Sequence, residues 1–390
     1  MIILGIETTC DETGASVVEG DPKSSLGLKV LSNVVASSFD LQKKYGGVVP
    51  EVAAREQVRV IIPVINEALE NAAEVGGWKL ETGRGNGKLD KESNIQLQNP
   101  DSHLFRLISK IDAIAVAYGP GLIGSLLIGV ETAKTLALAW NKPLIPVNHL
   151  VGHIYANWLA LTVNGKWKMV NGKRQKSIAY LPLTIHFPLI ALIVSGGHTD
   201  LVLMRDHAKF DLLGSTLDDA AGEAFDKVAR VLGMGYPGGP EIEKLAVKVE
   251  SGKYSIKLPR PMINSKSFDF SFSGLKTAVV NLIHSSEIID HRRAEIAAEF
   301  QKAVVDVLVN KTMKAAEKFG AKTIIIGGGV AANELLRSQM TTQSSRTGIT
   351  VLFPSKKLSV DNGAMIAAAA FYNFKQVDPL KLSADPSLHF

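Results

Sequence analysis

The sequence predicts an α/β protein built from two duplicated domains that face one another across a central cleft. The first observation is the length of 390 residues, which exceeds the size at which a single hydrophobic core stops growing. The second is that each half opens with a strand–turn–strand hairpin, over 2–19 and 189–204, and continues with alternating strands and helices. The halves share this element order without a strict sequence repeat, and we place their boundary within 148–188.

The elements of the first half follow from the spacing of its apolar residues. Short apolar runs bounded by turns predict strands, and apolar residues three and four positions apart predict helices. The expected elements are strands at 2–7, 15–19 and 31–37, a helix at 50–73, a strand at 111–117, a helix at 125–140, a strand at 143–147 and a helix that carries His149 and His153. Residues 76–107 are polar and glycine-rich, which predicts a flexible surface insertion.

The second half repeats this logic. The expected elements are strands at 189–195 and 200–204, a helix at 217–232, a long helical region at 286–319, a strand at 323–326, a helix that begins near Asn333, a strand at 349–353 and a helix at 364–374. We assign residues 1–150 to an N-terminal lobe and residues 151–390 to a C-terminal lobe. The last helix, at about 364–374, is expected to pack back on the N-terminal lobe.

Composition narrows the class of protein. A hydrophobic content of 46% with 21% charged residues is typical of a soluble globular protein. We find no apolar run near the roughly 18–20 residues that span a bilayer and no presequence, so we expect a cytoplasmic protein without a membrane partner. The single cysteine excludes an internal disulfide and a cysteine-based zinc site. A net charge of +5 permits a nucleic-acid partner without indicating one.

A histidine pair is the strongest chemical signal. His149 and His153 are one helical turn apart, so their side chains share a face and can bind one metal ion. Asp361 can complete a three-ligand site that keeps an open position. The alternative is a pair of ordinary helix histidines, because chance pairs at this spacing are common. A metalloprotease is disfavoured, because Leu150 stands where that class needs a glutamate.

Three glycine turns follow apolar strands or open helices. They lie at 195–198, 238–240 and 327–329. Glycines let backbone N–H groups approach a phosphate, and a helix N-terminus favours anions. One such turn is more simply a tight hairpin, but three together favour a nucleotide or phosphate site. None matches the P-loop or the dinucleotide fingerprint.

Several charged residues each allow two interpretations of their role. Asp226 lies two turns into its helix, so it either binds a ligand hydroxyl or pairs with Arg230 on the surface. Asp11 and Glu12 occupy the first hairpin turn, where they are candidate bases, although turns attract aspartate in any case. The basic segment 166–176, with its Asn-Gly turn, is either a nucleic-acid contact or a solvated hairpin.

Motifs along nearly the whole chain resemble one known family. They are GIETTCDET at 5–13, YGGVVPE at 45–51, GPGL at 119–122, the histidine pair, VSGGHT at 194–199, YPGGP at 236–240, FSFSGLKT at 270–277 and DNGAM at 361–365. The family is the universal tRNA threonylcarbamoyltransferase family, called TsaD in bacteria. The motif FSFSGLKT is similar to the one found in the bacterial and organellar branch of the family. The expected lack of a presequence favours a bacterial origin.

The resemblance implies an actin-like, sugar-kinase-like (ASKHA) fold of two RNase-H-like lobes. It implies transfer of the threonylcarbamoyl group from threonylcarbamoyl-AMP to N6 of the adenosine 3′ of the anticodon, in tRNAs that read ANN codons. By the same resemblance one divalent metal ion per subunit, Fe²⁺ or Zn²⁺, is held by His149, His153 and Asp361. The residues matching the adenylate-binding positions are Ile193, Val194, Ser195, Gly196, Gly197, Asp226, Gly239 and Asn333.

The resemblance also implies partners and shows departures. Bacterial members work with a TsaB-type paralogue and a TsaE-type ATPase. Gln57 stands where the family often has histidine, Thr9 where it often has serine, and the segments 76–107 and 160–185 have no counterpart in the typical bacterial pattern. Because of these segments, the resemblance does not identify the surfaces that bind the partners and tRNA. The rival functions are an ATP-dependent sugar kinase or chaperone-like ATPase of the same fold, and a non-catalytic scaffold.

Overall fold

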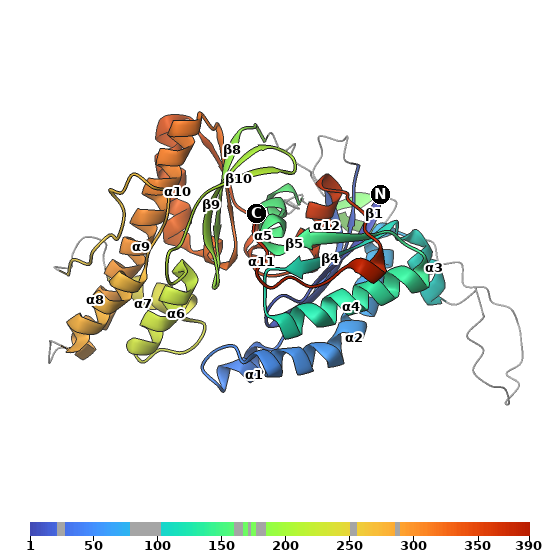
Figure 1. Ribbon diagram of the computed structural model, residues 1–390, viewed down its shortest axis with the longest axis horizontal. Coiled ribbons are helices and arrows are strands. Elements are labelled where there is room, and N and C mark those ends of the chain that lie inside the picture. Colours follow the sequence, from blue (N-terminus) through green and yellow to red (C-terminus); the bar gives the residue numbers. More distant parts are fainter. Residues whose placement is uncertain are drawn as a thin grey trace, which may run out of the picture.

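A computed structural model describes residues 1–21, 28–78, 103–159, 167–170, 173–176, 185–249, 256–284 and 289–390. Figure 1 shows two α/β lobes side by side, the first in blue and teal and the second in yellow and orange. Each lobe is built around one five-stranded sheet. The two sheets therefore form the frame on which every candidate site residue is placed.

The two sheets have the same strand order and the same strand directions. The first contains β1 (Ile2–Glu7), β2 (Glu12–Glu19), β3 (Lys29–Ser37), β4 (Ala113–Gly119) and β5 (Leu144–Asn148), in the order β3-β2-β1-β4-β5. The second contains β8 (Leu189–Val194), β9 (Thr199–Asp206), β10 (Lys209–Ser215), β11 (Thr323–Gly327) and β12 (Thr350–Leu352), in the order β10-β9-β8-β11-β12. In each sheet the first three strands are antiparallel and the last two run parallel to the first. The predicted duplication of α/β lobes is confirmed.

Helices cover the sheets in layers. Their bounds are α1 (Phe39–Lys43), α2 (Pro50–Gly76), α3 (His103–Lys110), α4 (Ile123–Trp140), α5 (His149–Tyr155), α6 (Ala221–Val231), α7 (Gly238–Ala246), α8 (Ser273–His284), α9 (Ile289–Phe319), α10 (Glu334–Thr347), α11 (Lys356–Ser359) and α12 (Gly363–Tyr372). Short 3-10 turns lie at Ala156–Trp158, Gly329–Ala332 and Pro379–Lys381. The strands β6 (Trp167–Val170) and β7 (Lys173–Lys176) form a separate antiparallel pair, and the predicted Asn-Gly turn at 171–172 lies outside the described residues.

Three apolar cores hold the helices and the sheets together. One lies under α2 and α4 on the outer face of the first sheet, and another lies under α6, α9 and α10 on the outer face of the second. The third joins the lobes, because it contains Ile3 from the first sheet, Leu189 and Ile325 from the second, and residues of α5 and α12. The helices α5 and α12 are thus buried between the two sheets, and they carry or adjoin the histidine pair and Asp361.

The start of α12 lies directly against the first sheet. A Cβ atom on Gly5 or Gly363 would overlap the backbone of the other residue, so both positions require glycine. Contacts of α12 with β1, β2 and β4 extend along the helix. This close packing fixes the position of Asp361, two residues before α12. The lobe bounds 1–150 and 151–390 stay a prediction.

Several expected elements differ from the observed ones. The helix α3 begins at His103, inside the range expected for the insertion, and residues 79–102 lie outside the described chain, so the insertion stays a prediction. The helix expected from 217 begins at Ala221, since Asp218 instead accepts hydrogen bonds from the N–H groups of Phe272 and Ser273. The short helices α1 and α11, as well as β10, α7 and α8, were not predicted.

One helix corrects the expectation about apolar runs. Among the described residues α4 is long and apolar enough to cross a membrane by length and composition. In the structure it packs against β4 and α2 and buries Leu126 and Val130 in the outer core of the first lobe. Its two charged residues, Glu131 and Lys134, pair with each other at 2.8 Å. One face of α4 therefore belongs to the apolar core, while Ile123, Leu127 and Leu138 elsewhere on the helix are exposed.

Candidate metal centre between the two lobes

The histidine helix begins where β5 ends. Asn148 is its N-cap, and the Asn148 Oδ1 atom accepts hydrogen bonds from the N–H groups of Leu150 at 2.8 Å and Val151 at 3.4 Å. His149 is therefore the first residue of α5, and His153 follows one turn later on the same face. Both side chains are buried, and their ring centroids are 4.6 Å apart.

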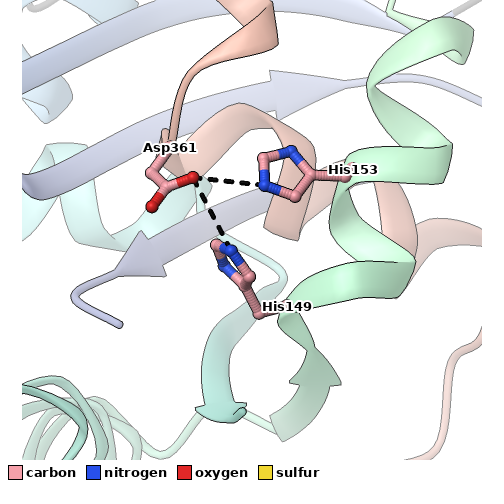
Figure 2. A group of neighbouring side chains, drawn as sticks. All are labelled: His149, His153 and Asp361. Atoms are coloured by element: carbon pink, nitrogen blue, oxygen red, sulfur yellow. Dashed lines mark ion pairs between the residues drawn. The ribbon is translucent and has the colours of Figure 1, made fainter. Parts of the chain in front are cut away.

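Asp361 reaches the two histidines from the far end of the sequence. Its Oδ1 atom lies 3.2 Å from His153 Nε2 and 3.6 Å from His149 Nε2. Figure 2 shows the Asp361 carboxylate facing both imidazole rings. One ligand atom from each of the three residues lies within 4.8 Å of the others. Two imidazoles and one carboxylate are a donor set that suits zinc or iron and leaves a coordination position open.

The ring nitrogens of His153 support this assignment. Both are buried, and neither makes a hydrogen bond of acceptable geometry, although Nε2 lies 3.2 Å from the Asp361 carboxylate. A buried polar atom without a partner costs about 1–3 kcal/mol. A metal ion bound to Nε2 would remove that cost for one of the two nitrogens. The residues present therefore fit a metal ion.

Two residues of the first lobe orient His149. Its Nδ1 atom lies 3.0 Å from Glu7 Oε2 and 3.2 Å from Thr9 Oγ1, and Glu7 Oε1 accepts a 2.6 Å hydrogen bond from the Thr9 N–H. Glu7 is fully buried at the end of β1. A carboxylate on one ring nitrogen leaves the other directed at a metal, and this arrangement is common around protein metal sites.

The charges of the centre reinforce one another. Burial opposes the charged form of His149, but Glu7 and Asp361 outweigh burial and raise the pKa of His149 to about 9. Burial also opposes ionisation of Asp361, while the neighbouring His149 and His153 lower its pKa to about 2. The buried carboxylate of Glu7 and the partly buried carboxylate of Asp361 therefore make surroundings that stabilise positive charge.

The hairpin turn at Asp11 and Glu12 lies beside this centre. The amide nitrogen of Gln57 on α2 donates to the carbonyl oxygens of Cys10 and Glu12, both at 3.0 Å, and so holds the turn. Burial, and then the charges of Asp361 and Asp11, raise the pKa of Glu12 to about 10. Glu12 therefore keeps its proton at neutral pH, and a bound cation would lower this pKa again.

The turn after β8 leaves its backbone open to a ligand. Gly196 and Gly197 are exposed, and a Cβ atom on either would meet no heavy atom within 4 Å. Ser195 Oγ accepts a 3.1 Å hydrogen bond from the His198 N–H and closes the turn. The turn lies against the start of α6, because a Cβ atom on Gly222 would come within 2.5 Å of the Ser195 carbonyl oxygen. Backbone N–H groups of this turn can therefore contact an anion.

Other predicted ligand residues also have structural roles. Ile193 and Val194 are fully buried in β8, so only their main chain can reach a ligand. Asn333 is the N-cap of α10; its Oδ1 accepts from the Leu336 N–H at 3.0 Å and its amide nitrogen donates to Gln301 Oε1 at 3.0 Å. The Asn333 side chain thus already forms hydrogen bonds within the protein through both its oxygen and its nitrogen.

Asp226 connects α6 to the glycine turn before α7. Its Oδ1 atom accepts a 2.6 Å hydrogen bond from the Gly238 N–H, and the adjoining Gly239 has open space at its Cβ position. Among the described residues Asp226 and Arg230 form no ion pair; the Arg230 guanidinium instead donates to the Gly46 carbonyl at 2.5 Å. The charge of Arg230 still acts on the Asp226 carboxylate, so the pairing is electrostatic and not a direct contact, and within the described residues only Oδ1 of Asp226 has a hydrogen bond.

Tyr236 links the two acidic positions across the lobes. Burial, and then the charges of Asp11 and Asp226, raise its pKa, which means that both carboxylates lie near its hydroxyl. Its ring stacks on Phe39 of the first lobe at 5.9 Å. Asp11 and Asp226 therefore belong to one region where the lobes meet.

The third glycine turn lies behind the histidine helix. A Cβ atom on Gly327 would come within 2.6 Å of the His153 carbonyl oxygen. Gly328 has a φ of 89°, and its Cβ position overlaps the Val194 backbone. Only glycines let β11 pass this close to α5 and β8, so here glycine serves packing.

Sequence reasoning missed Glu7, Asn148, Gln57 and His198 as parts of the site. Burial, then His149 and His153, lower the pKa of His198 to about 4, so it stays neutral beside the centre. Two of them had a usable signal, because Glu7 is a carboxylate that directly ends an apolar strand and Asn148 is a preferred N-cap residue directly before the histidine helix. The others depend on contacts between segments far apart in the chain.

Fold and site together define an actin-like α/β protein with a histidine–carboxylate centre between its lobes. A family model for TsaD, tRNA N6-adenosine threonylcarbamoyltransferase, matches residues 29–76 and 107–368. The protein of that name from Moorella thermoacetica is 44% identical over 390 residues, which cover 99% of this chain and 96% of that protein. The one from Thermomicrobium roseum is 47% identical over 393 residues, covering 95% and 92%. The chain belongs to the TsaD family, and the resemblance is confirmed.

Solved structures support the fold. HypF of T. kodakarensis superposes with a TM-score of 0.53 at 14% identity, over 95% of this chain and 47% of that one. A full-length HypF in a phosphate- and nucleotide-bound form gives the same TM-score at 14% identity, over 97% and 47%. At this identity the likeness concerns the fold alone.

Proposed function

We propose that this chain transfers the threonylcarbamoyl group from threonylcarbamoyl-AMP to N6 of the adenosine 3′ of the anticodon, in tRNAs that read ANN codons. The product is N6-threonylcarbamoyladenosine. Family membership supports the reaction, and the observation that carries it in this chain is the convergence of His149, His153 and Asp361 within 4.8 Å. The family match favours this transferase over the ATP-dependent sugar kinase or chaperone-like ATPase.

We propose that these three residues hold one divalent ion, Fe²⁺ or Zn²⁺. When bound, such an ion polarises a carbonyl oxygen as a Lewis acid. The chain's own contribution is orientation. Glu7 and Thr9 fix the ring of His149 through Nδ1, and the packing of α12 on the first sheet fixes Asp361.

The adenylate is proposed to lie along the second lobe. The backbone of the exposed residues Gly196 and Gly197 is suited to the phosphate, and the second carboxylate oxygen of Asp226 is suited to a ribose hydroxyl. Gly239 gives room for close approach. Ile193, Val194, Ser195 and Asn333 shape this site mainly through their backbone and the elements that they hold.

In the reaction a bond forms between N6 and the carbamoyl carbon, the bond from that carbon to the phosphate oxygen breaks, and N6 loses one proton. Asp11 and Glu12 are proposed to handle the protons. Both carboxylates stand at the first hairpin turn beside the metal centre, and either one is a candidate to accept the proton that N6 loses. The exocyclic amine is a weak nucleophile, so orientation supplies much of the rate.

A surface on the first lobe is suited to a TsaB-type partner. The exposed residues Val58 and Ile62 lie one turn apart on α2, and Ile123 and Leu127 lie one turn apart on the neighbouring α4. A Cβ atom on Gly124 would lie 3.4 Å from Ala54, which places these two pairs next to each other. Such an apolar patch is typical of a protein interface. We propose that this patch docks the paralogue, with a TsaE-type ATPase joining in the cytoplasm, and that no membrane takes part.

The proposal is tested by incubating the purified chain with threonylcarbamoyl-AMP and unmodified tRNA, with and without both partners. Digestion and mass spectrometry should then detect N6-threonylcarbamoyladenosine. A parallel incubation with ATP and a panel of sugars tests the rival function. Sugar-dependent ATP hydrolysis without any modified nucleoside would refute the transferase.

A further inference from the structure

Residues 385–390 cross the end of the first sheet next to the histidine helix. The Asp385 N–H donates to the Tyr118 carbonyl at 2.7 Å, and the Gly121 N–H donates to the Pro386 carbonyl at 3.4 Å. We name residues 385–390 the strap. It lies against the loop that follows β4.

The loop is shaped for the strap. A Cβ atom on Gly119 would overlap the Asp385 carbonyl and would lie 3.1 Å from the Leu388 Cβ. No side chain fits at position 119 while the strap is in place. This fit is independent of the hydrogen bonds and shows a close, specific contact.

The strap also binds the residue that begins α5. The amide nitrogen of Asn148 donates to the His389 carbonyl at 3.0 Å, while its Oδ1 caps α5. One side chain therefore joins the strap to the helix N-terminus, and His149 follows directly. Because the Asn148 amide nitrogen is bound to the His389 carbonyl, the Asn148 Oδ1 atom is directed at the N-terminus of α5.

The end of the strap contacts the second lobe. The ring of Phe390 lies 6.0 Å from the ring of Phe210 on β10 and packs on the apolar core that contains Leu150 and Ile154 of α5. The strap thus touches both lobes and the helix between them.

We propose that the strap is a positioning element for the metal centre: it fixes the start of α5 through Asn148 and so holds His149 toward Asp361. The inference rests on the metal role proposed above. Contacts that orient a metal ligand without touching the metal are worth about 10–100-fold in metal affinity. We expect a loss in this range when the strap is released.

The test uses the full chain, stripped of metal and titrated with Co²⁺, whose visible absorption reports ligand geometry. Asn148→Ser keeps a capping oxygen and loses the donor to His389, since serine caps helices about as well as asparagine. Gly119→Ala leaves Asn148 intact and displaces Asp385. Ser387→Ala is the matched control, because that side chain is exposed and the strap backbone is unchanged.

Both strap variants should bind Co²⁺ about tenfold or more weakly, with an altered spectrum, whereas Ser387→Ala should match the wild type. Circular dichroism and thermal unfolding identify folded variants, and either folded variant suffices. Wild-type affinity and spectrum in a folded strap variant would overturn the strap proposal alone. A wild-type chain that binds no Co²⁺ would overturn the metal centre, and the strap proposal with it.

Discussion

At the scale of single residues, Glu7 decides how His149 is presented. It is fully buried, and its two oxygens contact His149 Nδ1 and the Thr9 N–H. A buried carboxylate of this kind raises the basicity of a ligand imidazole and fixes its ring. Burying the Glu7 carboxylate costs stability, and the structure gives it one clear role, which is to orient His149 at the metal centre.

Replacing Glu7 with glutamine should lower metal affinity about 10–100-fold, because the amide keeps the shape and loses the charge that orients His149. Competitive titration with a chelator of known zinc affinity measures the change. Glu70→Gln on the exposed side of α2 is the control. Unchanged affinity in Glu7→Gln would show that the contact with His149 has no role in metal binding.

Gln57, a departure from the expected family pattern, has a structural role of its own. Its amide nitrogen holds the carbonyls of Cys10 and Glu12. In Gln57→Leu both carbonyls lose this partner, which should destabilise the fold by about 1–3 kcal/mol. Urea denaturation measures this loss, and Gln57→His provides a comparison with another side chain that can donate a hydrogen bond. Equal stability of Gln57→Leu and the wild type would contradict this role.

At the scale of elements, the sequence was most informative where an element is fully buried. The apolar run of β1 and the spacing of α5 predict both elements within a residue or two. The edge strand β10 was missed because Lys209 and Asp211 interrupt its pattern, and α7 was missed because it begins with Gly238, Gly239 and Pro240. Such elements depend on packing against neighbours that local propensity does not contain.

The turn between β9 and β10 carries a pH-sensitive contact. His207 stacks on Tyr372 of α12 at 4.3 Å, and its Nδ1 lies 3.0 Å from the Tyr155 hydroxyl. Burial lowers the pKa of His207 in the folded state. The unfolded chain, with a pKa of about 6.5, binds the proton more readily, so this stability is complete above about pH 6.5 and is lost as the pH falls below it.

His207→Phe should therefore lose less stability than the wild type between pH 7 and pH 5. Thermal unfolding of both proteins over this range measures the difference, and it cancels the contributions of other histidines. A steeper or equal loss in the variant would contradict the role of His207. The phenyl ring keeps the stack on Tyr372, so the comparison isolates the titration.

At the scale of the whole molecule, the duplication places α5 and α12 between two equivalent sheets. The residues of the centre come from β1, α5 and the segment before α12, and they are up to 354 positions apart, from Glu7 to Asp361. Sequence patterns identified the histidine pair because its spacing is local. They did not place Glu7, whose contact joins it to His149 across 142 positions, or the bond of Asn148 to His389 across 241 positions, because such contacts exist only in the folded chain.

The exposed apolar patch on α2 and α4 predicts which surface of the molecule binds a partner protein. Ile62→Glu should weaken binding of a TsaB-type paralogue by tenfold or more, because it buries a charge in an apolar contact. Isothermal titration with the purified paralogue measures the affinity. Leu380→Glu, at a residue exposed by 74%, is the matched control and should bind normally. Normal binding by Ile62→Glu would assign the partner to another surface.

The central claim is that one cation between the lobes is needed for transfer. The direct measurement is elemental analysis of wild-type chain and His149→Ala, both purified without chelator, next to the transfer assay with partners present. We predict close to one iron or zinc per wild-type chain, and neither metal nor N6-threonylcarbamoyladenosine for folded His149→Ala. Full transfer by His149→Ala without bound metal would contradict the account.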